Sequence, residues 1–305
     1  MAHTVAIAPG ITAIVRDWLN ANHALIEGDG NSVLVDTGCS MHARNTVELV
    51  RAASATGSVG RIVNTHCHSD HMGGNATLSR AFDAPIALPA DAAPLIDRWD
   101  QRELLLGYAD QSADRFDYVS TISGGEEVEL GGMRWQALAA PGHDMSALVF
   151  YSPEHRVLIS GDALWESSFG IVEPLDRLDE RLGAQRATLL AIAGLDVRTV
   201  IPGHGAPFGD VRAALDRAFQ RLDAYERDPL KLARHCLKAF FMFSLLGRGR
   251  LARKDLGAYF ERVPCYREYN ARFFNLAPEA LAEMLTGELV RAGVVVVRDG
   301  DLVPA

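Results

Sequence analysis

The sequence predicts a layered α/β protein followed by a smaller, mainly helical part. Up to about Asp210, short apolar runs alternate with Gly/Asn/Asp turns and a few helical stretches, a pattern typical of packed sheets with helices outside them. After Gly205 the pattern becomes helical and dense in leucine, phenylalanine and alanine. A chain of 305 residues is too long for one ordinary core. We therefore expect two parts, residues 1–210 and residues 211–305.

Short apolar runs bounded by turn residues predict the strands of the first part. The predicted strands are Thr12–Val15, His23–Glu27, Ser32–Val35, Arg61–Asn64, Pro85–Leu88, Met133–Ala139, Leu148–Tyr151, Val157–Ile159 and Thr199–Ile201. Between them, Ser40 is placed to cap a helix whose inner face carries Val47 and Val50. A second helix is expected over residues 176–193.

The second part predicts helices that end in a short hairpin. The helical patterns cover residues 211–227, 229–246, 255–263 and 278–292. Two apolar runs then flank Asp299-Gly300, a dipeptide typical of a hairpin turn. Helices ending in such a hairpin resemble a winged-helix unit.

Composition and charge favour a soluble protein whose main partner is neither nucleic acid nor an anionic membrane. A hydrophobic content of 48% is ordinary for a protein with a proper core, and a net charge of −9 disfavours nucleic acid or an anionic membrane as the main partner. No apolar stretch is long enough to cross a bilayer, and the start of the chain lacks a secretory pattern. The four cysteines show no paired spacing, which fits a reducing compartment. We expect a cytoplasmic protein, with the oligomeric state, a homodimer included, left open.

One segment, residues 64–75, concentrates residues that bind metal ions. It places His66, His68, Asp70 and His71 where a predicted strand runs into a helix. Clustered imidazoles repel one another when protonated and are costly to bury unpaired, so the cluster indicates a bound partner. Alternation along a strand points His66 and His68 to one side, a pair suited to one ion. Asp70 and His71, at the turn, can reach a neighbouring ion.

Three glycine-bounded loops, each after a predicted strand, add further candidate ligands. They contain His143, Asp162 and His204 in the sequences PGHD, GDA and PGHG. Glycine lets the backbone turn sharply there and lets a bulky ligand approach closely. Neutral imidazoles and carboxylates suit divalent zinc, iron and manganese.

With these motifs in this order, the chain resembles the metallo-β-lactamase superfamily, in particular its glyoxalase II-like hydrolases, over roughly residues 10–210. The resemblance implies a four-layer αββα sandwich with two divalent metal ions at one sheet edge, zinc being favoured and iron or manganese the alternatives. The ligand sets that it implies are His66, His68 and His143 for one ion and Asp70, His71 and His204 for the other, with Asp162 bridging both. It also implies that Asp36, in the sequence VDTG, supports the site from behind the ligands; a carboxylate that merely caps a turn is the alternative.

The chemistry that such a centre supports is hydrolysis. Two cations sharing a water lower its pKa from about 15.7 towards 7, which provides a metal-bound hydroxide at neutral pH. That hydroxide attacks a carbonyl or phosphoryl centre. We expect Asp70, besides binding metal, to act as a catalytic residue that orients the nucleophile or shuttles its proton.

Sequence details narrow the substrate. His68 stands where flavo-diiron proteins carry Glu, and Asp162 where zinc β-lactamases often carry Cys. Residues 163–203, between Asp162 and His204, leave no room for the inserted domain of the superfamily's nucleases. Reduction of oxygen, hydrolysis of antibiotics and nucleic-acid processing are therefore disfavoured.

The aromatic residues favour an apolar acyl group as the substrate. We expect Tyr108, Trp165 and Phe169 to help line the substrate pocket. The proposed reaction is hydrolysis of a small-molecule acyl ester or thioester; glutathione thioesters are in doubt, because the tail shows no convincing glutathione-binding set. Three alternatives stay open: a phosphodiesterase or ribonuclease, supported by the basic cluster at residues 248–254; a single-iron persulfide dioxygenase; and a regulator with vestigial hydrolase activity.

Overall fold

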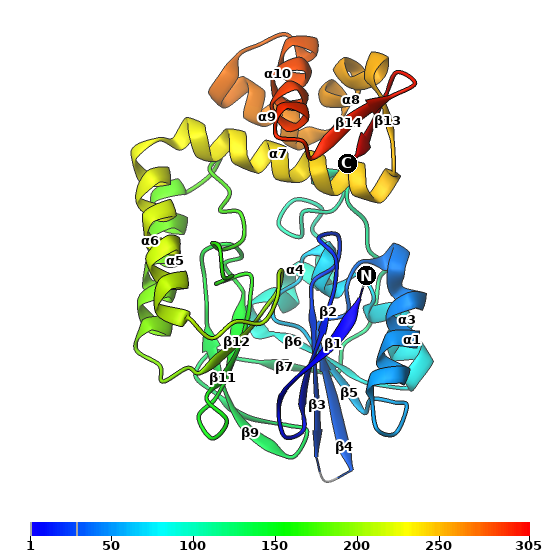
Figure 1. The fold of residues 1–305 in the computed structure, drawn as a ribbon, viewed down its shortest axis with the longest axis vertical. Coiled ribbons are helices and arrows are strands. Elements are labelled where there is room, and N and C mark those ends of the chain that lie inside the picture. The colour runs from blue at the N-terminus through cyan, green and yellow to red at the C-terminus, as the bar shows by residue number, and fades with distance from the viewer. Residues whose placement is uncertain (1, 29) are drawn as a thin grey trace.

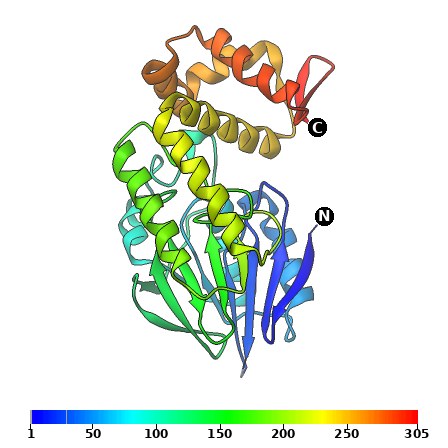
Figure 2. The ribbon, with the colours of Figure 1, turned by 60° about the vertical axis from the view of Figure 1, so that its left-hand side comes forward.

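Two sheets packed face to face form the centre of the computed structural model, which describes residues 2–28 and 30–305 (Figures 1 and 2). One sheet has seven strands in the order β1-β2-β3-β4-β5-β6-β7, and the other has five in the order β12-β11-β10-β9-β8. Apolar side chains from both sheets, such as Val35 and Val63 from the first and Phe150 and Ile159 from the second, form one buried cluster between them. The expected αββα sandwich is confirmed.

The seven-stranded sheet changes from antiparallel to parallel pairing at β4. Its strands are β1 His3–Ala8, β2 Ile11–Val15, β3 His23–Gly28, β4 Asn31–Val35, β5 Arg61–Val63, β6 Ile86–Pro89 and β7 Ser120–Ile122. Strands β1 to β4 pair antiparallel, and β4 to β7 pair parallel. Because the carboxyl ends of parallel strands meet at one edge, Asp36 after β4 and the histidine segment after β5 come together there.

The five-stranded sheet brings the remaining candidate ligands to the same end of the sandwich. Its strands are β8 Glu127–Leu130, β9 Met133–Ala139, β10 Leu148–Ser152, β11 Val157–Gly161 and β12 Thr199–Pro202. Asp162 follows β11 and His204 follows β12, and these two strands are parallel.

All nine strands predicted for the first part are present, whereas β1, β7 and β8 of the two large sheets were not predicted. Each of these three lies at the edge of a sheet. An edge strand needs fewer apolar residues than a central one, so β7 and β8 lack the hydrophobic run that marks the other strands. Strand β1 does carry such a run at residues 5–8, although these residues are exposed or half-buried, and the prediction missed it.

Helices cover the outer face of each sheet. The helices of the first part are α1 Ala43–Ala53, α2 Ser69–Met72, α3 Asn75–Phe82, α4 Ala93–Arg98 and α5 Leu178–Ala193. Val47 and Val50 of α1 pack with Leu78 of α3 against the seven-stranded sheet, as the pattern predicted. The expected cap is wrong: Ser40 starts a short 3₁₀ turn, and α1 begins after His42 without a side-chain cap.

The second part consists of helices and a small three-stranded sheet, drawn in yellow to red in Figure 1. Its elements are α6 Val211–Arg227, α7 Pro229–Arg248, β13 Leu251–Ala252, α8 Leu256–Arg262, α9 Pro264–Tyr269, α10 Pro278–Arg291, β14 Val295–Arg298 and β15 Asp301–Pro304. The side chains of Asp210 and Asp228 accept hydrogen bonds at the starts of α6 and α7. The predicted hairpin is present as β14 and β15, and the winged-helix likeness stays a prediction.

A single buried apolar cluster crosses the expected boundary at residue 210. It joins Leu158 on the outer face of the five-stranded sheet to Leu222 of α6, Phe240 of α7 and Leu285 of α10. The division into two domains stays a prediction. All four cysteines are free and buried. Within residues 2–28 and 30–305, no helix combines the length and apolar character needed to span a membrane.

Candidate metal centre

Seven imidazole and carboxylate side chains meet at one edge of the sandwich. They are His66, His68, Asp70, His71, His143, Asp162 and His204. Four follow β5, and the others follow β9, β11 and β12. Each of these side chains is at most 8% exposed. So many polar groups are costly to bury together unless charge and hydrogen bonds compensate.

The first group consists of three imidazoles. His66, His68 and His143 each offer a nitrogen, and the three nitrogens lie within 4.8 Å of one another. Nδ1 of His143 lies 2.5 Å from the carbonyl oxygen of Ile171, to which it donates, so its Nε2 keeps a free lone pair. That Nε2 lies 2.8 Å from Nδ1 of His68, and Nε2 of His66 is buried without a hydrogen-bond partner. Nitrogens that converge in this way fit a cation.

The second group combines imidazoles with a carboxylate. Asp70, His71 and His204 bring one atom each within 4.8 Å of the others. Oδ2 of Asp70 lies 3.0 Å from Nε2 of His204 and 3.7 Å from Nε2 of His71. Within residues 2–28 and 30–305, Nε2 of His71 is buried and has no hydrogen-bond partner, as expected of a nitrogen that binds a metal ion.

Asp162 lies between the two groups and presents one oxygen to each. Its Oδ2 lies 3.5 Å from Nε2 of His143 in the first group. Its Oδ1 lies 3.3 Å from Nε2 of His71 and 3.8 Å from Nε2 of His204 in the second. This geometry fits a carboxylate that bridges two cations. Nε1 of Trp165 donates to Oδ1 at 3.1 Å and holds the carboxylate in place.

Asp36 supports the second group from behind. Its Oδ2 lies 2.8 Å from Nδ1 of His71, and its two oxygens accept hydrogen bonds from the backbone N–H and the hydroxyl of Thr65. Its backbone is left-handed, with a φ of 61°, which is uncommon for a residue other than glycine. A proton fixed on Nδ1 of His71 would leave Nε2 free to bind metal, which is the supporting role that the resemblance implies.

The first group favours neutral imidazoles. Burial, and then the proximity of His71, hold the pKa of His66 well below its ordinary value. Burial and the proximity of His143 lower the pKa of His68 to about 4. A histidine binds metal through its neutral form, so these side chains are ready to bind at neutral pH.

In the second group, the pKa shifts favour a protonated histidine beside ionised carboxylates. Burial by itself would raise the pKa of Asp162, but His71 and His204 outweigh it and hold this pKa well below the ordinary value. Burial would lower the pKa of His71, but the surrounding carboxylates, that of Asp162 first, raise it well above the ordinary value. An imidazolium there balances ionised carboxylates, and its proton must leave when a cation binds.

Glycines let the backbone pack directly on the ligands. A Cβ atom at Gly203 would collide with Oδ1 of Asp162, and one at Gly170 would press on the ring of His143. Gly203 belongs to the PGHG sequence, where close approach was predicted, whereas Gly170 carried no such signal.

Sequence reasoning missed Trp18, an aromatic wall of the site. Its ring is 56% exposed and stacks on His204, with centroids 5.2 Å apart and planes at 9°. Trp165 and Phe243 meet the same imidazole edge-on, at 5.2 and 6.2 Å. A single tryptophan in the polar sequence DWLN gives no indication of this role.

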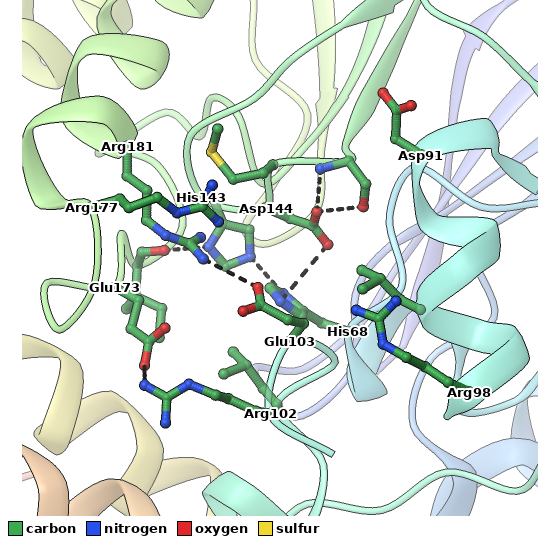
Figure 3. A pocket seen from close by; sticks show the side chains of 15 residues that line it. His68, Asp91, Arg98, Arg102, Glu103, His143, Asp144, Glu173, Arg177 and Arg181 are labelled. Atoms are coloured by element: carbon green, nitrogen blue, oxygen red, sulfur yellow. Dashed lines mark hydrogen bonds and ion pairs between the residues drawn. The ribbon is translucent and has the colours of Figure 1, made fainter. Parts of the chain in front are cut away.

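The three residues predicted to line the substrate pocket differ in how deeply they are buried. Trp165 is partly exposed beside the centre, but Phe169 and Tyr108 are only 2% and 4% exposed and pack into the core. A pocket of about 320 Å³ opens instead beside His68 and His143, and Figure 3 shows that charged side chains line it. The prediction that Phe169 and Tyr108 line the pocket is therefore corrected: beside His68 and His143 the pocket wall is charged.

Comparisons with known proteins agree with this geometry. The family model described as "Metallo-beta-lactamase superfamily" matches residues 16–204. A hydroxyacylglutathione hydrolase from Hyphomonas neptunium is 29% identical over 157 residues, which cover 50% of this chain and 52% of that protein. The acyl-coenzyme A thioesterase MBLAC2 from Gallus gallus is 27% identical over 215 residues, 63% of this chain and 75% of the relative. This chain thus spans about half the length of the first relative and three quarters of the second.

Solved structures share the fold over nearly the whole chain. A metallo-beta-lactamase family protein from Thermus thermophilus superposes with a TM-score of 0.60 at 22% identity, covering 98% of this chain and 100% of that one. A beta-lactamase domain protein from Burkholderia ambifaria gives 0.59 at 24% identity, covering 99% and 95%. Because the family model covers well over half of the residues, this chain belongs to the metallo-beta-lactamase superfamily.

Proposed function

We propose that this chain is a hydrolase that holds two divalent metal ions and cleaves an acyl thioester or ester. One observation carries the proposal: Asp162 lies between two groups of ligand atoms, and among the described residues Nε2 of His66 and Nε2 of His71 are buried without a hydrogen-bond partner. Buried nitrogens without partners are rare in folded proteins unless they bind something. Zinc is favoured, and iron and manganese are the alternatives, because imidazoles and carboxylates suit all three.

The protein's own groups would orient the reaction. When bound, two such cations supply a nucleophile from water at neutral pH and polarise the carbonyl of the substrate. Asp70 lies in the second group with its carboxylate toward His204. Burial opposes its ionisation, but His71 and His204 hold its pKa below the ordinary value, so it is ionised and can accept a proton from the nucleophile.

An acyl substrate is favoured by the aromatic wall around His204. Trp18, Trp165 and Phe243 surround this imidazole, and Trp18 is exposed enough to contact a substrate. An acyl chain laid on these rings would lose contact with water, which stabilises binding. Two relatives carry names that fit, one a hydroxyacylglutathione hydrolase and one an acyl-coenzyme A thioesterase.

The nuclease alternative loses part of its support. Arg248, in the basic cluster, is paired with Asp110 at 2.7 Å, and Arg250 lies 3.3 Å from Asp301. Phosphate contacts need cations that are free to bind. Arginines already paired with carboxylates contribute little, so nucleic acid stays disfavoured as a partner.

The test combines metal analysis with turnover. Purified protein should contain close to two metal ions per chain and hydrolyse a hexanoyl thioester in a metal-dependent way. His66→Ala should lose metal and activity together, whereas His3→Ala, at an exposed position outside the centre, should keep both. A single tightly held iron without hydrolysis would favour the persulfide dioxygenase. Full metal loading with no turnover of any thioester, ester or lactone would overturn the hydrolase in favour of a regulator.

A further inference from the structure

We propose that the pocket beside His68 and His143 is an anion subsite, in which Arg181 and Arg177 bind a carboxylate or phosphate on the leaving group of the substrate. The inference rests on the proposed hydrolase function, because it assigns a further part of the same substrate. It adds a specificity that neither the metal ligands nor the aromatic wall supplies.

The pocket adjoins the first group of ligands and is rich in guanidinium groups. It has a volume of about 320 Å³, and His68 and His143 form part of its wall. Arg98 from α4, Arg102 from the following turn, and Arg177 and Arg181 at the start of α5 line it (Figure 3). A small anionic group bound there would lie directly beside the centre.

Most charged groups of this wall already have partners. Arg102 forms ion pairs with Glu268 and Asp176. Oδ1 of Asp144 accepts hydrogen bonds from the backbone N–H and the hydroxyl of Ser146. These groups shape the pocket but have little capacity left for a ligand.

Glu173 also has partners already, because Arg102 lies 3.9 Å from its carboxylate. It is buried and accepts a hydrogen bond from the hydroxyl of Tyr108 at 3.1 Å. Burial raises its pKa, and the neighbouring guanidinium groups of Arg102 and Arg181 act against this shift.

Arg181 differs, because it is buried and incompletely paired. Its residue is 5% exposed, and its Nε has no hydrogen-bond partner within the described part of the chain. Among the described residues its ion pair joins a terminal nitrogen to Glu103 at 3.2 Å, and the side chain of Glu103 is 36% exposed. This guanidinium therefore keeps donors beyond its pair with Glu103, and a planar anion accepts two hydrogen bonds from such a group.

Arg177 provides a second cation on the same side. Its side chain is 59% exposed, and its ion pair with Glu180 is long, at 3.5 Å. The backbone of Arg177 is left-handed, with a φ of 51°, just before α5 begins. A sparsely populated conformation at the residue that carries this guanidinium fits a functional position.

The two sides of the centre suit the two ends of one substrate. The aromatic wall surrounds His204 of the second ligand group, whereas the arginines adjoin His68 and His143 of the first. With the acyl chain on Trp18, the leaving group points to the arginines.

Matched substrates that differ only in charge test the subsite in the metal-loaded enzyme. One pair is the hexanoyl thioesters of 3-mercaptopropionate and 3-mercaptopropionamide, and the other those of 4′-phosphopantetheine and pantetheine. The natural protein should prefer the anionic member of at least one pair by about tenfold in kcat/KM, and the pair preferred distinguishes carboxylate from phosphate. R181Q and R177Q should reduce this ratio, while R198Q, which removes an exposed arginine outside the pocket, should leave it unchanged.

A variant that should increase the preference for the anionic substrate distinguishes a loss of the subsite from misfolding. E103Q removes the carboxylate that competes for Arg181, so it should increase the preference for the anion, which a damaged protein would not do. Equal rates within both pairs for the natural protein, or a preference that survives R181Q, would overturn the subsite while leaving the hydrolase intact.

Binding separates failure of the subsite from failure of the hydrolase. If no thioester is turned over, the proposed function fails, and calorimetric titration of the holoprotein with the free thiols decides the subsite. Tighter binding of 3-mercaptopropionate than of its amide, or of 4′-phosphopantetheine than of pantetheine, lost in R181Q, would support it. Equal affinities would overturn it.

Discussion

The carboxylate of Asp36 and Nδ1 of His71 lie 2.8 Å apart, and both side chains are almost fully buried. This pair joins the end of β4 to the turn after β5. It fixes the ring of His71 and directs the other ring nitrogen toward Asp70 and Asp162. The orientation of a ligand in the second group therefore depends on a residue that is not itself a ligand.

Replacing Asp36 by Asn should weaken metal binding without removing a ligand. An amide keeps the size of the side chain but not its charge, so it holds the proton on Nδ1 of His71 less firmly. We expect metal affinity to fall by about 10- to 100-fold, measured by competition with a chelator. Unchanged affinity would show that Asp36 only caps the turn at Thr65.

Gly203→Ala should disrupt the bridging carboxylate. The added methyl group collides with Oδ1 of Asp162, so either this side chain or the loop that carries His204 must move. We expect substoichiometric metal and a large loss of activity. Gly183→Ala is the matched control, because the space around Gly183 in α5 is open and alanine favours a helix. If both variants bound metal like the natural protein, the close packing at Gly203 would be irrelevant to the site.

Trp18→Ala should impair hydrolysis of long-chain thioesters more than that of acetyl thioesters. The exposed ring offers apolar area to an acyl chain, and its loss should lower kcat/KM for a hexanoyl substrate about five- to tenfold. Stability should change little, because the ring is 56% exposed. Leu190→Ala, at another exposed apolar position, should alter neither substrate. Equal losses for short and long chains would contradict a role in acyl binding.

His235 should make the protein less stable in mild acid. Burial, and then the nearby cations of Arg221 and Lys238, lower its pKa to about 4, and its ring stacks on Tyr225. In the unfolded chain this pKa is about 6.5, so the unfolded state binds more protons between the two values. Its contribution is therefore complete above about pH 6.5 and is lost as the pH falls toward 4.

The check for His235 is a comparison of two stability curves. Because the side chain is only partly buried, we expect His235 to contribute about 1–2 kcal/mol to the pH dependence of the free energy of unfolding. Urea unfolding at pH values between about 4.5 and 7.5 measures this contribution. His235→Phe keeps a ring on Tyr225 but cannot be protonated, so its curve should fall less steeply. Parallel curves would place the acid sensitivity elsewhere, for example in the metal centre.

The sequence determined the buried strands and the set of candidate ligands. Both depend on local signals: an apolar run between turns marks a strand, and the spacing of histidines after β5 marks a metal site at a strand end. The edge strands β7 and β8 lack such a run, because an edge can be stable with fewer buried residues, whereas β1 has one at residues 5–8 that the prediction missed.

Tertiary structure alone decided how these residues face one another. No sequence pattern shows that Trp18 stacks on His204 or that Asp162 turns one oxygen to each ligand group. Nor does one show that Arg181 lines the same pocket as His143. From the sequence, Tyr108 and Phe169 could line the substrate pocket or pack in the core. The packing of the fold placed both in the core. Burial and pairing arise from contacts between segments far apart in the chain, so residue types identified the chemistry while the fold set its geometry.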